Sequence, residues 1–182
     1  KALKGIVTKE MKAVVRGEGV SPEWLREKIA SGRVVIPANR NHRGLKPIGI
    51  GEGLRIKVNT NIGTSSDHVD LEEELKKLEV SIQAGTDTVM DLSTGGDIDG
   101  IRKEIIRHSP IPVGTVPIYE AAIEAAKKRK ALAKMRAGDL FEVIERQAEG
   151  GVDFITVHCG VTQNTVERLR QAHRLLGVVS RG

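Results

Sequence analysis

The sequence has almost no cysteine and no long apolar run. Cys159 is the only cysteine among 182 residues, which excludes an internal disulfide framework. A zinc site or an iron–sulfur cluster that takes several cysteines from this chain is excluded for the same reason. No apolar run approaches the roughly 20 residues that a membrane-spanning helix needs, and the first residues lack the apolar stretch of a signal peptide. We therefore expect a cytoplasmic protein with no membrane partner.

Aromatic residues are equally scarce, at 2% of the chain. The sequence thus lacks the stacking platform that binds single-stranded nucleic acid. The formal net charge is +5, but basic and acidic residues are interspersed, as on an ordinary solvated surface. The one dense basic run, residues 127–130, is typical of a solvated helix end. We expect no nucleic-acid partner, and the 39% of hydrophobic residues is enough for one core.

From residue 55 onward, strand-like and helix-like segments alternate. The predicted strands lie at 55–61, 86–92, 111–116 and 152–157, with a fifth beginning at 178–179. The predicted helices lie at 70–84, 97–108, 119–130, 139–149 and 162–175. This alternation predicts an α/β fold with a parallel sheet and right-handed crossovers. Repeated βα units favour a TIM-like (β/α)8 barrel, although periodicity leaves a doubly wound sheet open.

A barrel of eight units typically needs about 250 residues, and this chain holds about four units. We therefore expect residues 54–182 to form the first half of a barrel, within a protein longer than this chain. Residues 1–53 differ and are expected to form an N-terminal segment that packs on the barrel. Ser21 and Pro22 predict a helix start there, as N-cap and first helical residue.

In such barrels the active site lies at the carboxyl ends of the strands. The side chains at or just after the carboxyl ends of the predicted strands are mostly polar, and they include Asn59, Asn61, Asp91, Tyr119, His158, Ser180 and Arg181. This set indicates a small polar ligand, and an anionic one. A structural role is the alternative for several of them. Asn59 and Asn61 are suited to cap turns, Asp91 to cap the next helix, Met90 to fill the core and Tyr119 to satisfy a buried acceptor.

Two strand ends carry more specific signals. His158 is suited to proton transfer or to donating to an anion, because its ordinary pKa is about 6.5. Its neighbour Cys159 points to the opposite face and is expected to be a buried, inert thiol. Ser180, Arg181 and Gly182 combine a hydroxyl, a fork-shaped cation and an open backbone N–H, which are phosphate-binding elements.

Taken together, the strand-end strings resemble one family, the radical S-adenosylmethionine phosphomethylpyrimidine synthases known as the ThiC family. The matching strings occur in the family's order and span nearly the whole chain: 36–39 (IPAN) with Asn41 and His42, 57–63 (KVNTNIG), 89–95 (VMDLSTG), 113–119 (VGTVPIY), 151–158 (GVDFITVH) and 180–182 (SRG). The set is specific, although each string alone is not.

The resemblance implies a (β/α)8 barrel and a radical reaction. In this family a reduced [4Fe-4S] cluster cleaves S-adenosylmethionine, and the resulting radical converts 5-aminoimidazole ribotide into hydroxymethylpyrimidine phosphate for thiamine. The implied substrate contacts are Asn61, Met90, Tyr119, His158, Ser180, Arg181 and Gly182. No catalytic residue is implied within this chain. The family is also a homodimer and carries zinc on two histidines that we expect beyond residue 182.

The departures from the family pattern concern the metal sites above all. The family's three-cysteine cluster string is absent from this chain, which therefore has no metal site of its own and is not a complete catalyst. Thr60 stands where the family usually has alanine. Two alternatives remain open: the paralogous 5-hydroxybenzimidazole synthase, which uses the same substrate, and a non-catalytic ribotide-binding module.

Overall fold

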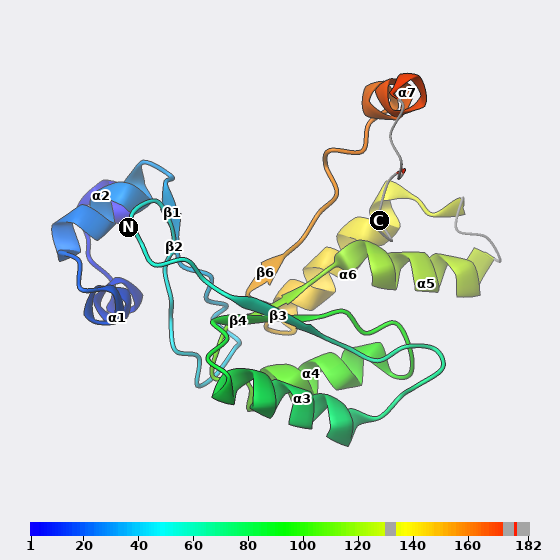
Figure 1. Cartoon of the computed structure of the whole chain (residues 1–182), viewed down its shortest axis with the longest axis horizontal. Helices are drawn as coiled ribbons and strands as arrows, with labels where there is room; N and C mark the ends of the chain where they lie inside the picture. The colour runs from blue at the N-terminus through cyan, green and yellow to red at the C-terminus, as the bar shows by residue number, and fades with distance from the viewer. Residues whose placement is uncertain (130–133, 173–176, 178–182) are drawn as a thin grey trace.

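A four-stranded parallel sheet organises most of the chain in the computed structural model, which describes residues 1–129, 134–172 and 177 (Figure 1). The strands are β3 (Asn59–Ile62), β4 (Thr88–Asp91), β5 (Val113–Thr115) and β6 (Phe154–Ile155), in that spatial order. The helices between and after them are α3 (Leu71–Gln83), α4 (Ile98–His108), α5 (Pro117–Arg129), α6 (Ala137–Glu149) and α7 (Gln163–Gln171). The predicted α/β class and parallel sheet are confirmed. The four described strands form an open sheet and not a closed barrel.

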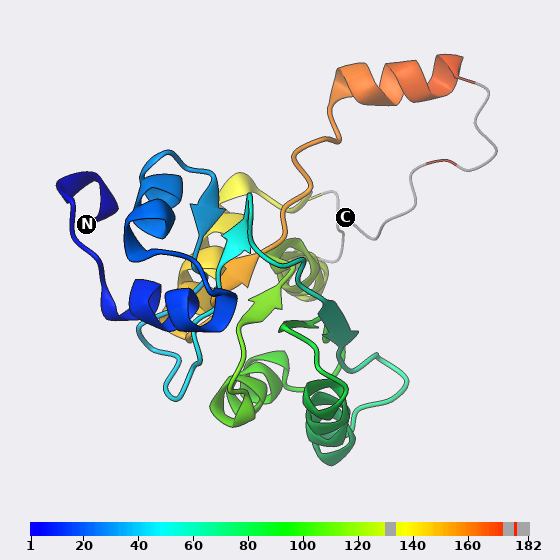
Figure 2. The same ribbon diagram turned by 60° about the vertical axis from the view of Figure 1, so that its left-hand side comes forward.

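The two faces of the sheet differ in what they carry. Ile62, Val89 and Val113 are buried against apolar residues of α3 and α4, and Thr115 on the same face donates to Gln147 of α6 at 2.6 Å. The opposite face carries Asn61, which is exposed, and residues of β4 and β6 that are half-buried. Helices α3, α4 and α6 thus cover one face, as Figure 2 also shows for α3 and α4.

Local signals explain where the helices begin. Asp70 and Asp97 are the N-caps of α3 and α4, and their side chains accept from the N–H groups of Glu73 and Gly100, both at 3.1 Å. Side-chain caps of this kind stabilise a helix start by about 1 kcal/mol. Each cap lies three positions from the N–H group that it binds, so both helix starts can be read from the local sequence. The predicted helices 70–84 and 97–108 differ from the observed ones by at most one residue at each end.

The first predicted strand is longer than the observed one. Residues 55–58 lie outside β3, and side chains hold this segment: Glu18 of α1 binds the Arg55 N–H and Lys57, and Asp87 binds the segment at both of its ends. The Asp87 carboxylate pairs with the Arg55 guanidinium and accepts from the Val58 N–H at 2.8 Å. The predicted strand at 178–179 and the end of the predicted helix 162–175 lie outside the described residues.

The N-terminal unit has its own small core. It consists of a 3-10 turn (Ala2–Lys4), α1 (Lys9–Glu18), α2 (Pro22–Ala30) and the antiparallel pair β1 (Val34–Val35) and β2 (Ile50–Gly51). Met11, Val14, Leu25 and Val34 are buried together in it. The sequence predicted α2 with its Ser21 cap, but it missed α1 and β2. Strand β2 includes Gly51, where a Cβ would lie 2.2 Å from the carbonyl oxygen of Arg33.

The loop between β1 and β2 joins this unit to the amino-terminal ends of β5 and β6. The Asn39 side chain donates to the Val152 carbonyl at 2.8 Å, and the Asn41 side chain donates to that of Glu149 at 2.9 Å. The string 36–42 therefore lies at the end of the sheet opposite to the carboxyl ends of the strands. None of the helices in the described part of the chain is long and apolar enough to cross a membrane.

Candidate functional site

Four of the seven predicted site residues lie at the carboxyl edge of the described sheet. Asn61 and Met90 are register partners on β3 and β4. The rings of Tyr119 and His158 are neighbours, with centroids 6.5 Å apart and planes inclined by 34°. The other three, Ser180, Arg181 and Gly182, lie outside the described residues.

A cavity of about 550 Å³ opens at this edge beside β3. Asn61 and Tyr119 both line it, from β3 and from the start of α5, together with the β3–α3 loop and Leu92 and Thr94 of the next loop. The volume falls in the range of small-molecule sites. Asn59 donates to the Oδ1 of Asn61 at 2.9 Å, so the Asn61 amide is held by its own strand. The turn-capping interpretation of these asparagines is replaced by this pairing.

The open face of the sheet continues the site toward β6. Met90, Gly114 and Phe154 occupy one level of the register, next to Asn61. A Cβ on Gly114 would lie 2.3 Å from the Phe154 ring, so the ring lies directly over the glycine. Thr156 donates to the Met90 sulfur at 3.6 Å. The half-buried Met90 therefore belongs to the open face and not to the core beneath the sheet.

The first two loops at this edge are bonded to each other. The Leu92 N–H donates to the Ile62 carbonyl at 2.8 Å, and the Thr64 N–H donates to the Ser93 hydroxyl at 3.1 Å. Thr64 also donates from its hydroxyl to the Gly95 carbonyl at 2.7 Å. These bonds make the β3–α3 and β4–α4 loops one wall of the cavity.

Asp91 neither caps the next helix nor lies on the face of the sheet that carries Asn61 and Met90. It is buried, and its Oδ1 accepts from the Ser93 N–H at 2.9 Å. Burial raises the pKa of Asp91, and the hydrogen bonds from Ser93 only partly offset that effect. The interpretation as a helix cap is wrong, because Asp97 caps α4. Asp91 orders the loop after β4 on the face that the helices cover.

Behind Tyr119 lies a buried charge network that the sequence did not predict. Glu120 accepts from Arg102 at 2.7 Å, from Gln147 at 2.7 Å and from Arg146 at 2.9 Å. Burial raises the pKa of Glu120, but the hydrogen bond from Gln147 and the charge of Arg102 outweigh it and hold the pKa below its usual range. The network ties α4, α5 and α6 together next to Tyr119. No local sequence pattern predicts this network, because its residues have the spacing of ordinary surface charges.

No metal site is present among the described residues: they contain no group of three histidine, cysteine or acidic side chains able to hold an ion. Cys159 is exposed, so the expectation of a buried thiol is wrong. Strand β6 ends at Ile155, and the chain then turns away from the sheet (Figure 1). Cys159 therefore lies beyond the part of the chain that packs on the sheet.

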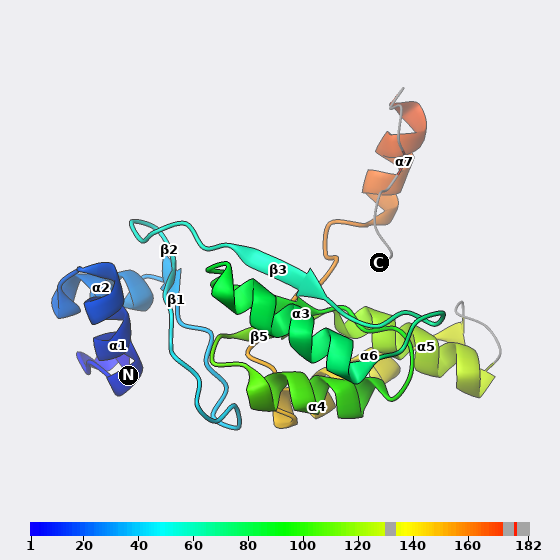
Figure 3. The ribbon, with the colours of Figure 1, turned by 60° about the horizontal axis from the view of Figure 1, so that its bottom comes forward.

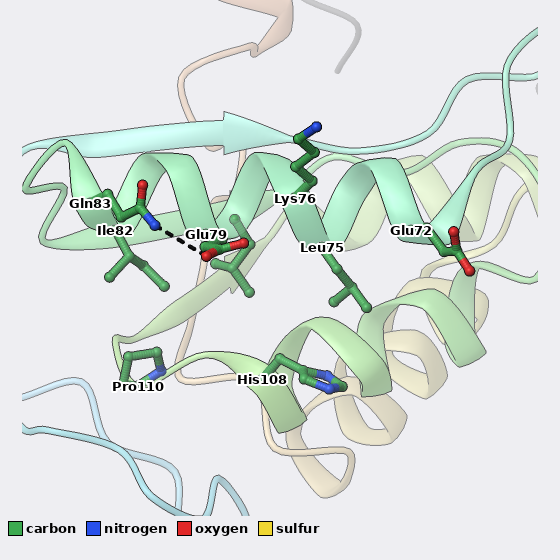
Figure 4. Close-up of a pocket in the computed structure, with 9 residues that line it drawn as sticks. Glu72, Leu75, Lys76, Glu79, Ile82, Gln83, His108 and Pro110 are labelled. Atoms are coloured by element: carbon green, nitrogen blue, oxygen red, sulfur yellow. Dashed lines mark hydrogen bonds between the residues drawn. The ribbon is translucent and has the colours of Figure 1, made fainter.

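A separate cavity of about 660 Å³ lies between α3 and α4 on the outer side of the molecule (Figure 4). Leu75, Ile82 and Pro110 form its apolar part, and Gln83 donates to Glu79 at 3.1 Å along its rim. It contains none of the predicted site residues and no strand end. It is therefore not part of the candidate site.

Comparison with known proteins gives one consistent result. The model of the radical SAM ThiC family matches residues 1–182. The phosphomethylpyrimidine synthase of Moorella thermoacetica is 59% identical over 178 residues, covering 98% of this chain and 41% of that protein. Those of Desulforamulus reducens and Thermus thermophilus are 54% and 56% identical, each covering 100% of this chain and 42% of the relative. The chain thus spans about two-fifths of the length of these relatives.

Proposed function

Because the chain belongs to the radical SAM ThiC family, we propose that it is part of a phosphomethylpyrimidine synthase of thiamine pyrimidine synthesis. The proposed substrate is 5-aminoimidazole ribotide, and the proposed product is 4-amino-5-hydroxymethyl-2-methylpyrimidine phosphate, formed by a carbon–carbon lyase of the radical type. The observation that carries the proposal is the gathering of Asn61, Met90, Tyr119 and His158 at one edge of the sheet, in a chain that matches the family throughout.

Each site residue has a role suited to this substrate. The amide of Asn61 and the imidazole of His158 hydrogen-bond the polar atoms of the imidazole ring or the ribose. The apolar side chain of Met90 lies on the open face, where it packs on the planar ring. The Tyr119 hydroxyl adds a further donor at the cavity wall. Ser180, Arg181 and Gly182 bind the phosphate, Arg181 by paired charge-assisted hydrogen bonds.

The metal groups of the family do not fit this chain's own residues. A [4Fe-4S] cluster takes several thiolates, and the chain has one cysteine. We propose that the ligands of the cluster and of the zinc ion come from the remainder of the full-length protein, as does the binding of S-adenosylmethionine. No chemical step is therefore assigned to a residue of this chain, whose proposed part is to bind and orient the ribotide.

We also propose that the open sheet is part of a (β/α)8 barrel in a cytoplasmic homodimer. Its four strands are parallel and follow chain order, and α3, α4 and α6 pack on one face, which is the arrangement of consecutive barrel units. Apolar residues are exposed beside both outer strands, with Val58 at 57% and Val157 at 50%. Further strands of the full-length protein would cover these edges.

The test is product analysis with the full-length protein. The protein is reconstituted anaerobically with iron and sulfide and given aminoimidazole ribotide, S-adenosylmethionine and a reductant. The expected result is the mass of the pyrimidine phosphate, formed only when all components are present. A hydroxybenzimidazole product would identify the paralogous synthase instead. Binding of the ribotide without any product would favour the ribotide-binding module.

A further inference from the structure

A buried carboxylate lies directly behind the first strand of the candidate site. Glu74 of α3 has a side chain that is only 1% exposed. Its Oε2 accepts from the Gly63 N–H at 2.7 Å, and its Oε1 accepts from the Lys77 ammonium at 2.8 Å. Gly63 is the first residue after β3 and lies two positions from Asn61. Figure 3 shows α3 running alongside β3, so this contact joins the helix to the end of the strand.

Gly63 leaves the strand in a conformation that needs this support. Its φ is +141°, and a Cβ would lie 2.5 Å from the Ser93 nitrogen and 2.6 Å from the Leu92 carbonyl carbon. The chain is therefore pressed against the loop after β4 on one side. On the other side, Glu74 supplies the acceptor for an N–H that is otherwise turned away from the sheet. A buried N–H without an acceptor is unfavourable, so removing the acceptor would shift Gly63.

The position of this contact connects it to the ligand cavity. Gly63 and Thr64 line the cavity of about 550 Å³ together with Asn61 and Tyr119. Among the residues that the structure describes, the Asn61 amide is held only by Asn59, a residue of its own strand, so its placement in the cavity follows the backbone of β3. A shift of the Gly63 backbone would therefore also move the backbone of Asn61, which lies two residues earlier, and with it the Asn61 amide.

We infer that Glu74 is a positioning residue for Asn61, acting through the Gly63 N–H. The inference rests on the proposed function for the identity of the ligand, aminoimidazole ribotide. Glu74 itself does not line the cavity. The inference assigns positioning to the oxygen of Glu74 that accepts from Gly63, whereas its other oxygen pairs with Lys77, a residue that also lines the cavity.

Two substitutions of Glu74 separate these contributions. Glu74→Gln keeps an oxygen that accepts from Gly63, and Glu74→Met has nearly the same length without an acceptor. Both variants lose the ion pair with Lys77 and are expected to lose similar thermal stability. In the full-length reconstituted protein, Glu74→Met should raise KM for the ribotide about tenfold with kcat within about threefold. Glu74→Gln should restore KM to within about threefold of the unsubstituted protein.

Glu79 provides the matched control. It is an exposed glutamate on the same helix whose only hydrogen bond in the described structure comes from Gln83. Glu79→Gln and Glu79→Met should leave KM unchanged. If Glu74→Gln and Glu74→Met raise KM equally, in proportion to their loss of stability, the role is structural and the inference fails. An unchanged KM in a folded Glu74→Met protein overturns it as well.

A second measurement keeps the inference separate from the proposed function. Amide hydrogen exchange of the peptide spanning residues 59–66 is followed without any ligand. Exchange should accelerate in Glu74→Met and stay near the original rate in Glu74→Gln. If the unsubstituted protein does not turn over the ribotide, the proposed function fails. Equal exchange rates in the two Glu74 variants would reject the positioning role whatever the substrate is.

Discussion

His42 and Asp153 lie 111 positions apart in the chain, and their side chains form an ion pair with no solvent exposure. The Nδ1 of His42 is 2.6 Å from an Asp153 oxygen, and its Nε2 is 2.8 Å from the Ser109 carbonyl oxygen. Both partners are acceptors, so the protonated imidazole donates to both of them, one from each ring nitrogen. This pair fastens the N-terminal unit to the amino-terminal ends of β5 and β6.

Removing His42 should destabilise the protein strongly. His42→Ala leaves a buried carboxylate without its cation, which typically costs about 3–5 kcal/mol. The measurement is the free energy of unfolding from urea denaturation of the full-length protein. His68→Ala is the control, since His68 also lies 2.6 Å from a carboxylate, that of Glu73, but is 62% exposed. The control should change the free energy by less than about 1 kcal/mol, and equal losses in the two variants would contradict the prediction.

The same pair predicts a pH dependence of stability. Burial lowers the pKa of His42, but the hydrogen bonds to Asp153 and Ser109 outweigh it and raise the pKa above 6.5. The stabilising contribution is therefore fully present below pH 6.5 and is lost as the pH rises through the raised pKa of the folded state. The difference in unfolding free energy between the unsubstituted protein and His42→Gln should therefore shrink as the pH rises above 6.5. A difference that stays constant up to pH 9 would refute the assignment.

Gly114 should tolerate no side chain. Gly114→Ala drives its methyl group into the Phe154 ring, where the nearest ring atoms lie 2.3 and 2.4 Å away. Overpacking of this kind costs about 1–3 kcal/mol and would displace the ring from the open face beside Met90. Gly138→Ala is the comparison, because no atom lies within 4 Å of that Cβ and the residue is in α6. It should be neutral or stabilise by up to about 1 kcal/mol in thermal or urea unfolding. Equal tolerance at both positions would contradict the contact with Phe154.

The network behind Tyr119 should depend on the charge of Glu120. Glu120→Gln leaves Arg102, which is 2% exposed, with Asp99 as its remaining carboxylate. The expected loss of unfolding free energy is about 3 kcal/mol, the usual result of breaking a buried ion pair. Glu124→Gln removes a partner of Arg146 at a more exposed position and should cost about 1 kcal/mol or less. A loss no larger than that of Glu124→Gln would show that the buried charge is not needed.

Asn61 should affect binding without affecting stability. The side chain is exposed and makes one hydrogen bond within the described structure, from Asn59. Asn61→Ala should raise KM for the proposed substrate, aminoimidazole ribotide, at least about tenfold, because it removes the hydrogen bonds that we propose Asn61 makes to it. Its melting temperature should stay near that of the unsubstituted protein. Asn164→Ala, an exposed position on α7, should change neither quantity. An unaltered KM in Asn61→Ala would remove Asn61 from the site.

Much of the α/β unit could be predicted because its signals are local. Predicted helix starts at 70 and 97 rest on aspartate caps, and the apolar spacing after them selects the buried face. The order of helices and strands then implies a parallel sheet. The strand ends were less accurate. Residues 55–58 read as part of a strand, but their backbone N–H groups bind side chains, Arg55 that of Glu18 and Val58 that of Asp87. The pattern of the segment itself does not reveal these partners.

The candidate site also has a part that the sequence predicted and a part that it did not. The positions of strand ends, together with the resemblance, were enough to name Asn61, Met90, Tyr119 and His158 as site residues. The family match confirms the resemblance itself. Glu74 and Glu120 could not be named in this way, because both have the spacing of surface charges on amphipathic helices. Their burial arises only when α3 packs against the loop after β3, and when α5 packs on α4 and α6.

The sequence by itself determined the helices after residue 55, the parallel order and the family, since capping residues, apolar periodicity and contiguous strings act over a few positions. Only the tertiary structure decided which charges are buried and what they hold. The His42–Asp153 and Glu74–Gly63 contacts exist because packing removes water from groups that would otherwise be solvated. Such groups must find partners within the protein, and the partner is whichever residue the fold brings into reach.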